Sequence, residues 1–278
     1  MAREPKLPKS VLDTQSLKAL LGAMLEQVDN SRFSEADDDA QALMFDAWEC
    51  DGRRKRVALA RKALAISADC ADAYLLLAQE AAPTEAEALA LLTQGVAAGE
   101  RALGPAAFEE DAGHFWGLIE TRPYMRTRQA LALALWAAGR REEAVGHAAE
   151  LLRLNPGDNQ GIRYVLINWR LTLGQDVEVA ALLKRYQSAG DAQWTWPATL
   201  AAFRRSGDGP AARKALLAAI AANRFVTPYL LGRRKRPKTL PPFYSPGEME
   251  EALIYLSDAG ADSWAATPAA LAWLAEQI

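Results

Sequence analysis

The densest group of polar and aromatic side chains in the sequence lies between Gly113 and Arg128. It includes His114, Trp116 and Arg126. A guanidinium pairs with a carboxylate through two parallel hydrogen bonds, and an aromatic ring adds rigid contact area. The segment therefore predicts a binding site for a carboxylate or an extended peptide. The alternative is structural, with Trp116 filling a gap in the fold and the arginines held in internal ion pairs.

A second polar group follows Pro156 and is expected on the first helix of a helix pair. Ile162, Leu166 and Trp169 recur at helical spacing there and should form the buried face of that helix. The polar candidates for contact with a partner on the same helix are Asn159, Arg163, Tyr164 and Asn168.

A shift of 35 residues relates the two groups and places Arg128 on Arg163 and Gln129 on Tyr164. Neighbouring repeats would then present stacked arginines to one ligand, and a peptide with an acidic segment is the expected partner. On this interpretation, replacing both arginines abolishes partner capture and leaves the helical circular dichroism unchanged. The alternative is that Asn155 and Asp158 cap helices and Arg163 pairs with a neighbouring acid.

The sequence GRRKR occurs twice, at 52–56 and 232–236. Such clusters can contact phosphates, so the alternative function is a nucleic-acid-binding accessory protein that uses residues 53–56 and 233–238. The chain has 32 basic and 35 acidic residues and a net charge of −3, which gives no general attraction to nucleic acid or to an anionic membrane. A protein or peptide partner is therefore favoured over nucleic acid.

Residues suited to catalysis or metal binding are sparse. The two histidines, His114 and His147, and the two cysteines, Cys50 and Cys70, do not have the spacing of zinc ligands. The sequence contains no glycine-rich phosphate loop, nucleophile elbow or HExxH motif. We expect no catalytic residue, no metal site and no cofactor. An enzyme would need a deep pocket near His114 and Glu120.

Both cysteines fall in helix-like segments, where we expect buried thiols of a reducing compartment rather than a disulfide. The N-terminus carries Arg3, Lys6 and Lys9 without the apolar stretch of a signal peptide. No stretch of about 18 apolar residues could span a bilayer. These features predict a cytoplasmic location and no membrane partner.

The elements that position these residues are helices in a repeat. The clearest unit is a helix-turn-helix from Tyr124 to Pro156, with its turn at Gly139 and a small residue, Ala144, where the second helix packs on the first. Gly174 follows Gly139 by 35 residues, and the next such glycine, Gly207, follows after 33. This period, close to the 34 residues or so of a tetratricopeptide repeat, predicts an all-α, right-handed solenoid of antiparallel helix pairs.

Three regions follow from this pattern. Residues 1–35 should form an N-terminal arm and a helix, with that helix at Thr14 to Val28. Residues 36–222 should form the repeat array, interrupted by a loop and a short aromatic segment at 104–123. Residues 223–278 should form a proline-rich loop and a C-terminal helical cap, because the end of a solenoid needs cover for its last apolar face.

The cap is expected as two helices, at 248–258 and 268–276. The aromatic residues Phe225, Tyr229, Phe243 and Tyr244 suggest that the preceding loop is ordered. The acidic run at 35–39 is typical of a helix start, and the run at 109–111 of a loop. First helices line the concave groove of such an array, which places the expected binding groove on the helices at 37–50, 71–81, 124–138 and 159–173.

The residues also resemble a known family. The runs Ala73 to Glu80 and Gly139 to Val145, together with Tyr229-Leu230-Leu231 and Leu240-Pro241-Pro242, are similar to the suppressor of tumorigenicity seven family over about residues 40 to 275. The resemblance implies a helical repeat body without known catalytic residues. The eukaryotic members are linked to growth control and carry hydrophobic N-terminal segments that this alanine- and arginine-rich, bacterial-type sequence lacks.

Overall fold

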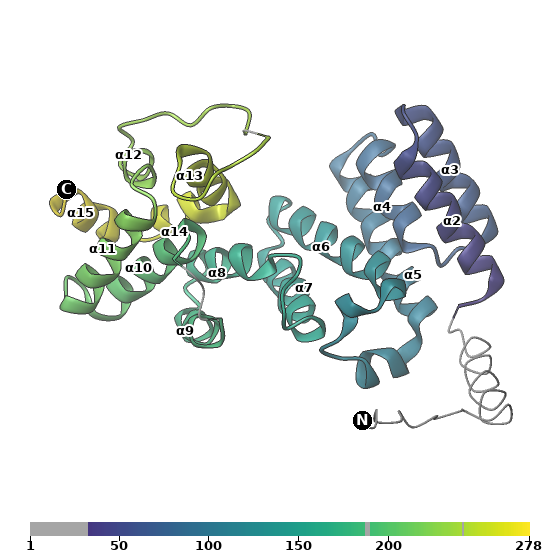
Figure 1. The fold of residues 1–278 in the computed structure, drawn as a ribbon, viewed down its shortest axis with the longest axis horizontal. Helices are drawn as coiled ribbons and strands as arrows, with labels where there is room; N and C mark the ends of the chain where they lie inside the picture. Colours follow the sequence, from purple (N-terminus) through teal and green to yellow (C-terminus); the bar gives the residue numbers. More distant parts are fainter. Residues whose placement is uncertain (1–32, 187–189, 241) are drawn as a thin grey trace, which may run out of the picture.

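The computed structural model describes residues 33–186, 190–240 and 242–278, and these residues form helices and no strand. The predicted all-α class is confirmed. The helix expected at Thr14 to Val28 lies outside the described residues. The molecule is elongated, and its helices follow one another along the long axis from α2 to α15 (Figure 1).

The first eleven helical elements form the body of the chain. They are α2 (Glu35–Glu49), α3 (Arg53–Ile66), α4 (Ala71–Glu80), α5 (Glu85–Glu110), η1 (Phe115–Gly117), η2 (Ile119–Thr121), α6 (Arg122–Ala137), α7 (Arg141–Leu154), α8 (Ile162–Thr172), α9 (Asp176–Arg185) and α10 (Ala192–Ser206). They are followed by α11 (Pro210–Ala222), α12 (Val226–Leu230), α13 (Met249–Tyr255), the π-turn η3 (Leu256–Gly260), α14 (Ala261–Ala265) and α15 (Pro268–Glu276). Consecutive helices pack together, and α4 also contacts α2 and α6, as α10 contacts α8.

Glycines close the turns between paired helices, as their spacing predicts. Gly139 has φ 79° between α6 and α7, and Gly174 and Gly207 also have positive φ between later pairs. A residue with a Cβ is strained in this region, so glycine is the residue that ends one helix and lets the next fold back.

A different glycine sets how closely the helices approach. A Cβ on Gly95 of α5 would lie 2.7 Å from the Cβ of Tyr74 and 2.8 Å from the Cγ2 of Thr127. Real side chains do not sit so close, so the missing Cβ lets α5 pack tightly against both α4 and α6. Glycine lowers helix propensity by about 1 kcal/mol, a cost that this packing offsets.

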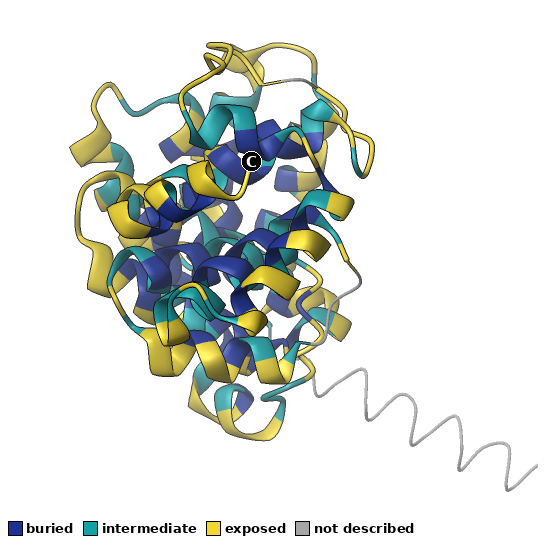
Figure 2. Cartoon of the chain, turned by 90° about the vertical axis from the view of Figure 1, so that its left-hand side faces the viewer, coloured by how far each residue is buried: buried dark blue, intermediate teal, exposed yellow. Residues whose placement is uncertain are grey.

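The core has two parts. A small cluster between α2, α3 and α4 is built mainly from alanines around Met44, and a continuous cluster runs from α4 to the C-terminus. Trp136 and Trp169 stack within the larger cluster, with ring centroids 4.7 Å apart and planes 7° apart, and so join α6 to α8. Figure 2 shows these buried residues inside the body and the exposed ones on the outer helix faces.

The segment at 104–123 differs from the predicted loop. Helix α5 bends at Gly104, where φ is 71°, and continues through Pro105 to Glu110, so the acidic run at 109–111 ends a helix rather than lying in a loop. Proline is tolerated there because it begins a new helical turn after the bend. Phe115 in η1 is fully buried against the rings of Phe108 and Tyr124.

The C-terminal region is more broken than predicted. The expected helix at 268–276 is confirmed as α15, but the one at 248–258 ends at Tyr255 and turns through η3 into the additional helix α14. Phe225 and Tyr229 pack on the core, as an ordered loop requires. Phe243 and Tyr244 do not, because they are 84% and 51% exposed.

This C-terminal region covers the helices that precede it. Both η3 and α14 pack on α8, and α13 and α15 pack on α10 (Figure 1). The buried carboxylate of Glu251 in α13 accepts hydrogen bonds from the backbone N–H of Ala192, at 3.1 Å, and from the Nδ2 of Asn223, at 2.9 Å. The C-terminal region therefore folds back over α8 and α10. The predicted cap was expected to cover only the last helix pair, so the covered surface is larger than predicted.

Candidate functional site

Arg126 lies between α2 and α4 and is held by an internal acid. Its Nη2 and Nε lie 2.5 Å and 3.1 Å from the two carboxylate oxygens of Asp72, which is completely buried on α4. Gln41 donates a further hydrogen bond to Asp72 at 2.9 Å. The guanidinium also lies over the ring of Trp48, 5.0 Å from its centroid. Arg126 therefore joins three helices while keeping a third of its side chain exposed.

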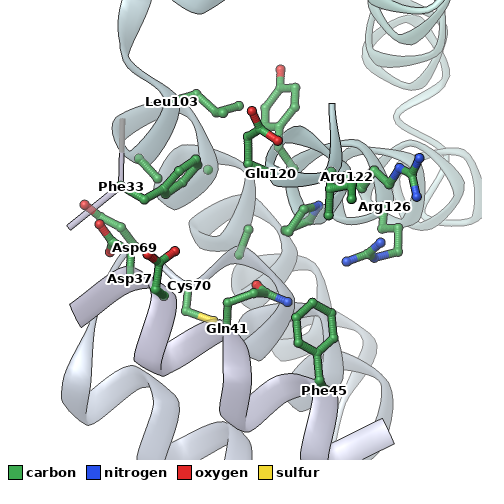
Figure 3. A pocket seen from close by; sticks show the side chains of 17 residues that line it. Phe33, Asp37, Gln41, Phe45, Asp69, Cys70, Leu103, Glu120, Arg122 and Arg126 are labelled. Atoms are coloured by element: carbon green, nitrogen blue, oxygen red, sulfur yellow. The ribbon is translucent and has the colours of Figure 1, made fainter. Parts of the chain in front are cut away.

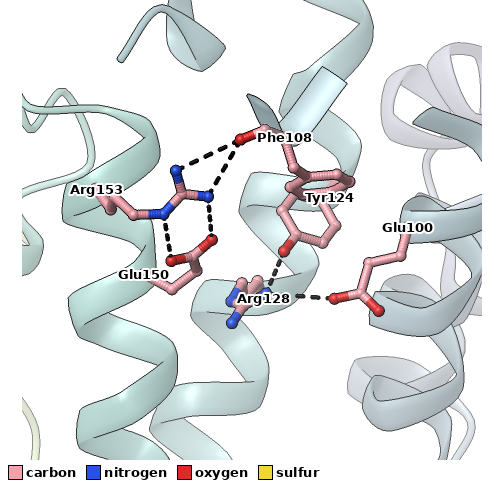
Figure 4. Close-up of polar contacts among 6 residues, drawn as sticks. All are labelled: Glu100, Phe108, Tyr124, Arg128, Glu150 and Arg153. Atoms are coloured by element: carbon pink, nitrogen blue, oxygen red, sulfur yellow. Dashed lines mark hydrogen bonds and ion pairs between the residues drawn. The ribbon is translucent and has the colours of Figure 1, made fainter. Parts of the chain in front are cut away.

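Arg128 is paired inside the molecule as well. Its Nη1 donates a hydrogen bond to the hydroxyl of Tyr124 and lies 3.4 Å from the carboxylate of Glu100 on α5 (Figure 4). Burial, opposed in part by the nearby Arg128, raises the pKa of Tyr124 to about 12, so its hydroxyl stays protonated. On the neighbouring helix α7, Arg153 pairs with Glu150 at 2.7 Å.

Arg163 pairs with a neighbouring acid inside the molecule, as the structural alternative for this residue predicts. Its Nη1 lies 3.1 Å from the carboxylate of Asp158, which also accepts hydrogen bonds from the backbone N–H of Ile162 and Arg163 and so caps α8. The guanidinium stacks on Tyr164, 4.3 Å from the ring centroid, and donates to its hydroxyl at 2.7 Å. Burial raises the pKa of Asp158 even though these hydrogen bonds oppose the shift.

The remaining polar candidates divide between surface and interior. Asn159 is exposed, and Gln129 accepts a hydrogen bond from the Nε2 of Gln160 at 2.7 Å. Asn168 was expected to face a partner, but it is only 1% exposed. Its amide donates to the carbonyl of Tyr164 and accepts from the hydroxyl of Ser263 in the folded-back C-terminal region, so no partner can reach it.

The molecule has a hollow on the side of α2, α4 and α6 that the C-terminal region does not cover. A cavity of about 330 Å³ lies between α2 from Asp37 to Phe45, the start of α4, the second half of α5, and η2 with the start of α6 (Figure 3). Its lining includes Phe33, Asp37, Gln41, Phe45, Glu120 and Arg126. This arrangement brings together parts of the chain that the sequence separates by about eighty residues.

Carboxylates outnumber free cations in this cavity. Asp37 accepts hydrogen bonds from Ser34 and Ser67; these hydrogen bonds lower its pKa although burial acts to raise it. Among the described residues, Asp38 and Glu120 make no ion pair or hydrogen bond through their side chains. The predicted helix start at 35–39 is confirmed by the capping box of α2, yet its acids also line the cavity.

Apolar groups form the rest of the lining and extend beyond it. Phe45 is 50% exposed and Ile119 is 67% exposed at the edge of the cavity. The ring of Trp48, itself 43% exposed, lies 6.1 Å from that of Phe45 on the outer face of α2. A binding partner would therefore meet a charged hollow bordered by aromatic surface.

Cys70 borders the same cavity but lacks the properties of a nucleophile. Burial raises the pKa of its thiol to about 11, so it is protonated at neutral pH. The prediction of a buried thiol is confirmed for Cys70. It is wrong for Cys50, which is only partly buried because it caps the C-terminus of α2.

A protein-family model described as ST7 protein matches residues 26–202, more than half of the chain. The chain belongs to the ST7 protein family. No solved structure matches this ST7-family chain. The match covers the helices that line the cavity and confirms the resemblance found in the sequence.

Trp116 and His114, two site candidates from the sequence, do not line the cavity of this ST7-family chain. The guanidinium of Arg122 lies over the ring of Trp116, 5.3 Å from its centroid, and its Nε donates to the carbonyl of Trp116 at 3.0 Å. His114 is exposed at the start of η1. An enzyme was expected to need a pocket near both His114 and Glu120. The cavity is lined by Glu120 but not by His114.

The two basic clusters of the ST7-family chain do not form one surface. Residues 53–56 open α3 and residues 233–238 follow α12, at opposite ends of the long axis (Figure 1). In the first cluster, Arg56 is paired with Glu80 at 2.7 Å and Arg53 donates to a backbone carbonyl. A short nucleic acid could not contact both clusters together.

The sequence indicated Arg126 and Glu120 as candidates but not most of the cavity lining, including Asp38, Phe45 and Ile119. Within the described ranges, no three His, Cys, Asp or Glu side chains are grouped so that they could share a metal ion. No helix in the same ranges has the length and apolar character that crossing a membrane requires.

Proposed function

We propose that this ST7-family chain is a non-catalytic interaction scaffold in the cytoplasm, and that it binds a segment of a partner protein in the cavity between α2, α4, α5 and α6. Tetratricopeptide-like stacking of its helix pairs into a right-handed solenoid is part of this proposal. The paired packing of consecutive helices and the recurring glycine turns support that arrangement. Both described cysteines are free thiols, which agrees with a reducing compartment.

In such an array the first helix of each pair lines one common face. These helices are α2, α4, α6, α8 and α10, and the first four of them correspond to the groove expected from the sequence. Among the described residues, the C-terminal region packs on α8 and α10. The cavity lies instead along α2, α4 and α6, with the second half of α5 completing its lining, and this position is the observation that carries the proposal.

The size and lining of the cavity suit the anchoring side chains of an extended peptide. Its volume of about 330 Å³ is at the lower end of the range for ligand sites, roughly 300 to 1,000 Å³. Protein interfaces concentrate their binding energy in a few side chains that enter such hollows, surrounded by aromatic surface. Phe45 and Ile119 provide that surface.

The test is selection from a random peptide library on the full chain, followed by binding titrations of the enriched peptides. In Ala102→Leu, a leucine fills the cavity, because Ala102 lines it. The matched control is Ala180→Leu, which places the same side chain in a separate hollow between α9 and α10. Circular dichroism and thermal unfolding verify that both variants keep the fold.

We expect enriched peptides with dissociation constants in the micromolar range, about −8 kcal/mol, and a loss of at least tenfold in Ala102→Leu but not in Ala180→Leu. Peptides that lose affinity only in Ala180→Leu would move the binding site to the other hollow and contradict the proposal. Failure to enrich any peptide would also count against it.

A further inference from the structure

The ion pairs around the cavity determine which of its charges remain for a ligand. The charge of Arg126 is balanced by buried Asp72. The lining carboxylate of Asp69 is balanced by Arg101, 2.6 Å away. These four groups cancel in pairs, so they contribute little net field to the cavity.

Three carboxylates and one guanidinium remain. The Asp37 carboxylate accepts only from the hydroxyls of Ser34 and Ser67 and from the backbone N–H of Ser34, and the side chains of Asp38 and Glu120 are not paired with another described residue. Arg122 is the one lining cation without an ion pair among the described residues, and it is turned onto Trp116. The cavity therefore has a net negative charge, opposite to the site that stacked arginines would have made.

The charges are also separated within the cavity. Asp37 and Asp69 lie beside Phe33 at one side, and Arg122 and Arg126 lie at the other (Figure 3). A cation that binds beside Asp37 would keep its distance from both arginines. Phosphates would be repelled by the net negative charge, so the charge distribution disfavours nucleic acid here.

We infer that the cavity selects a basic protein segment, in which a lysine or arginine enters beside Asp37 and Asp38 while Glu120 adds negative charge on the other side of Phe33, and a neighbouring apolar residue packs on Phe45 and Ile119. This inference rests on the proposed function and reverses the acidic partner expected from the sequence. The apolar surface distinguishes a peptide from a free amine. Trp48, which lies next to Phe45, continues this surface outside the cavity, where only a ligand longer than one side chain can cover it.

The experiment uses the library-selected peptides in two forms, one as selected and one with every lysine and arginine replaced by glutamine. Binding of both forms is titrated to the full chain, to Asp38→Asn with Glu120→Gln, and to Asp38→Lys with Glu120→Lys. Asp39→Asn is the matched control, because Asp39 is an exposed acid on the same helix that does not line the cavity. Spermidine serves as the free-amine probe.

The inference predicts that selected peptides contain lysine or arginine and that the glutamine form binds at least about tenfold more weakly. The neutral double variant should bind about three- to tenfold more weakly, because the two acids are at the surface, and the lysine double variant should lose at least about thirtyfold. Asp39→Asn should not differ from the unchanged chain.

Acidic or uncharged peptides that still lose affinity in Ala102→Leu would overturn the inference and leave the proposed function standing. Unchanged binding of a basic peptide to both double variants would also overturn it. Spermidine that binds as tightly as the peptides and displaces them would show a free-amine site instead of a peptide site. Loss of all sensitivity to Ala102→Leu would refute the proposed function itself.

Discussion

The Nη2 of Arg126 on α6 lies 2.5 Å from the Oδ2 of Asp72 on α4, and the two residues are 54 positions apart in the sequence. The carboxylate is completely buried, whereas the arginine is 32% exposed. Loss of either partner should therefore have a different effect on the stability of the fold. Removing the arginine leaves a buried negative charge, while removing the acid leaves a cation that water and the ring of Trp48 can still stabilise.

This asymmetry gives a prediction for stability. Arg126→Leu should lower the free energy of unfolding by about 3 kcal/mol, because an unpaired charge stays buried. Asp72→Asn should cost less, about 1 to 2 kcal/mol, because only one hydrogen-bonded partner is weakened. Urea unfolding of both variants measures the difference. An Asp72→Asn variant less stable than Arg126→Leu would contradict this account of the pair.

The folded-back C-terminal region should contribute strongly to stability. Trp264 is fully buried, packs on Trp196 with centroids 5.9 Å apart, and donates to the hydroxyl of Tyr255 at 3.0 Å. Trp264→Ala should cost about 3 to 5 kcal/mol. Hydrogen exchange should then accelerate in α8 and α10, which this region covers.

The control for this variant is Phe243→Ala, which truncates an aromatic residue that is 84% exposed in the same part of the chain. It should change stability by no more than about 0.5 kcal/mol. If both variants cost the same, or if Trp264→Ala leaves exchange in α8 unchanged, the C-terminal region does not pack on α8 as described.

A pH effect is expected at Asp258. Burial raises the pKa of its carboxyl to about 6, above its value in an unfolded chain. The folded state then binds the proton more tightly, so this group favours folding at low pH. Its contribution falls as pH rises from about 4 to about 6 and stays constant above that range.

Asp258→Asn should therefore stabilise the protein by about 2 kcal/mol near pH 7.5 and by much less near pH 4.5. Urea unfolding at the two pH values measures the change. Asp262→Asn is the control, because Asp262 is exposed on the adjacent helix α14. An equal effect of Asp258→Asn at both pH values would show that ionisation of Asp258 is not the cause.

Substitutions of two glycines, Gly139 in the turn between α6 and α7 and Gly146 within α7, distinguish the effect of turn geometry from that of helix propensity. Gly139 has φ 79° in the turn, so Gly139→Ala should cost about 1 to 2 kcal/mol. Gly146 is exposed within α7 with no neighbouring heavy atom near an added Cβ, so Gly146→Ala should stabilise by up to about 1 kcal/mol. Thermal unfolding should shift in opposite directions, and a shift in the same direction would refute the turn assignment.

Local signals in the sequence were sufficient for much of the fold. Gly139 and Pro156 mark their turns because glycine and proline act on the backbone directly. The role of Asp158 as a helix cap was also accessible, since its partner Arg163 is five residues away. Both features depend on residues that are neighbours in the chain.

Features that depend on distant contacts could not be predicted. Nothing near Arg126 in the sequence indicates that Asp72 neutralises it, and nothing near Asn168 indicates that Ser263 covers it. A helical pattern shows which face is apolar but not which later segment will pack there. The expected site therefore contained arginines that are already paired, and Asp37 and Asp38 were recognised only as part of a helix start.

Hydrogen exchange of the full chain with and without a library-selected peptide tests the central claim most directly. The account predicts that the peptide slows exchange in residues 35–49 and 119–126, which contribute side chains to the lining of the cavity. It predicts no change in residues 176–205, where the second hollow lies. Protection confined to residues 176–205, or absent from α2, would contradict the placement of the binding site between α2, α4, α5 and α6.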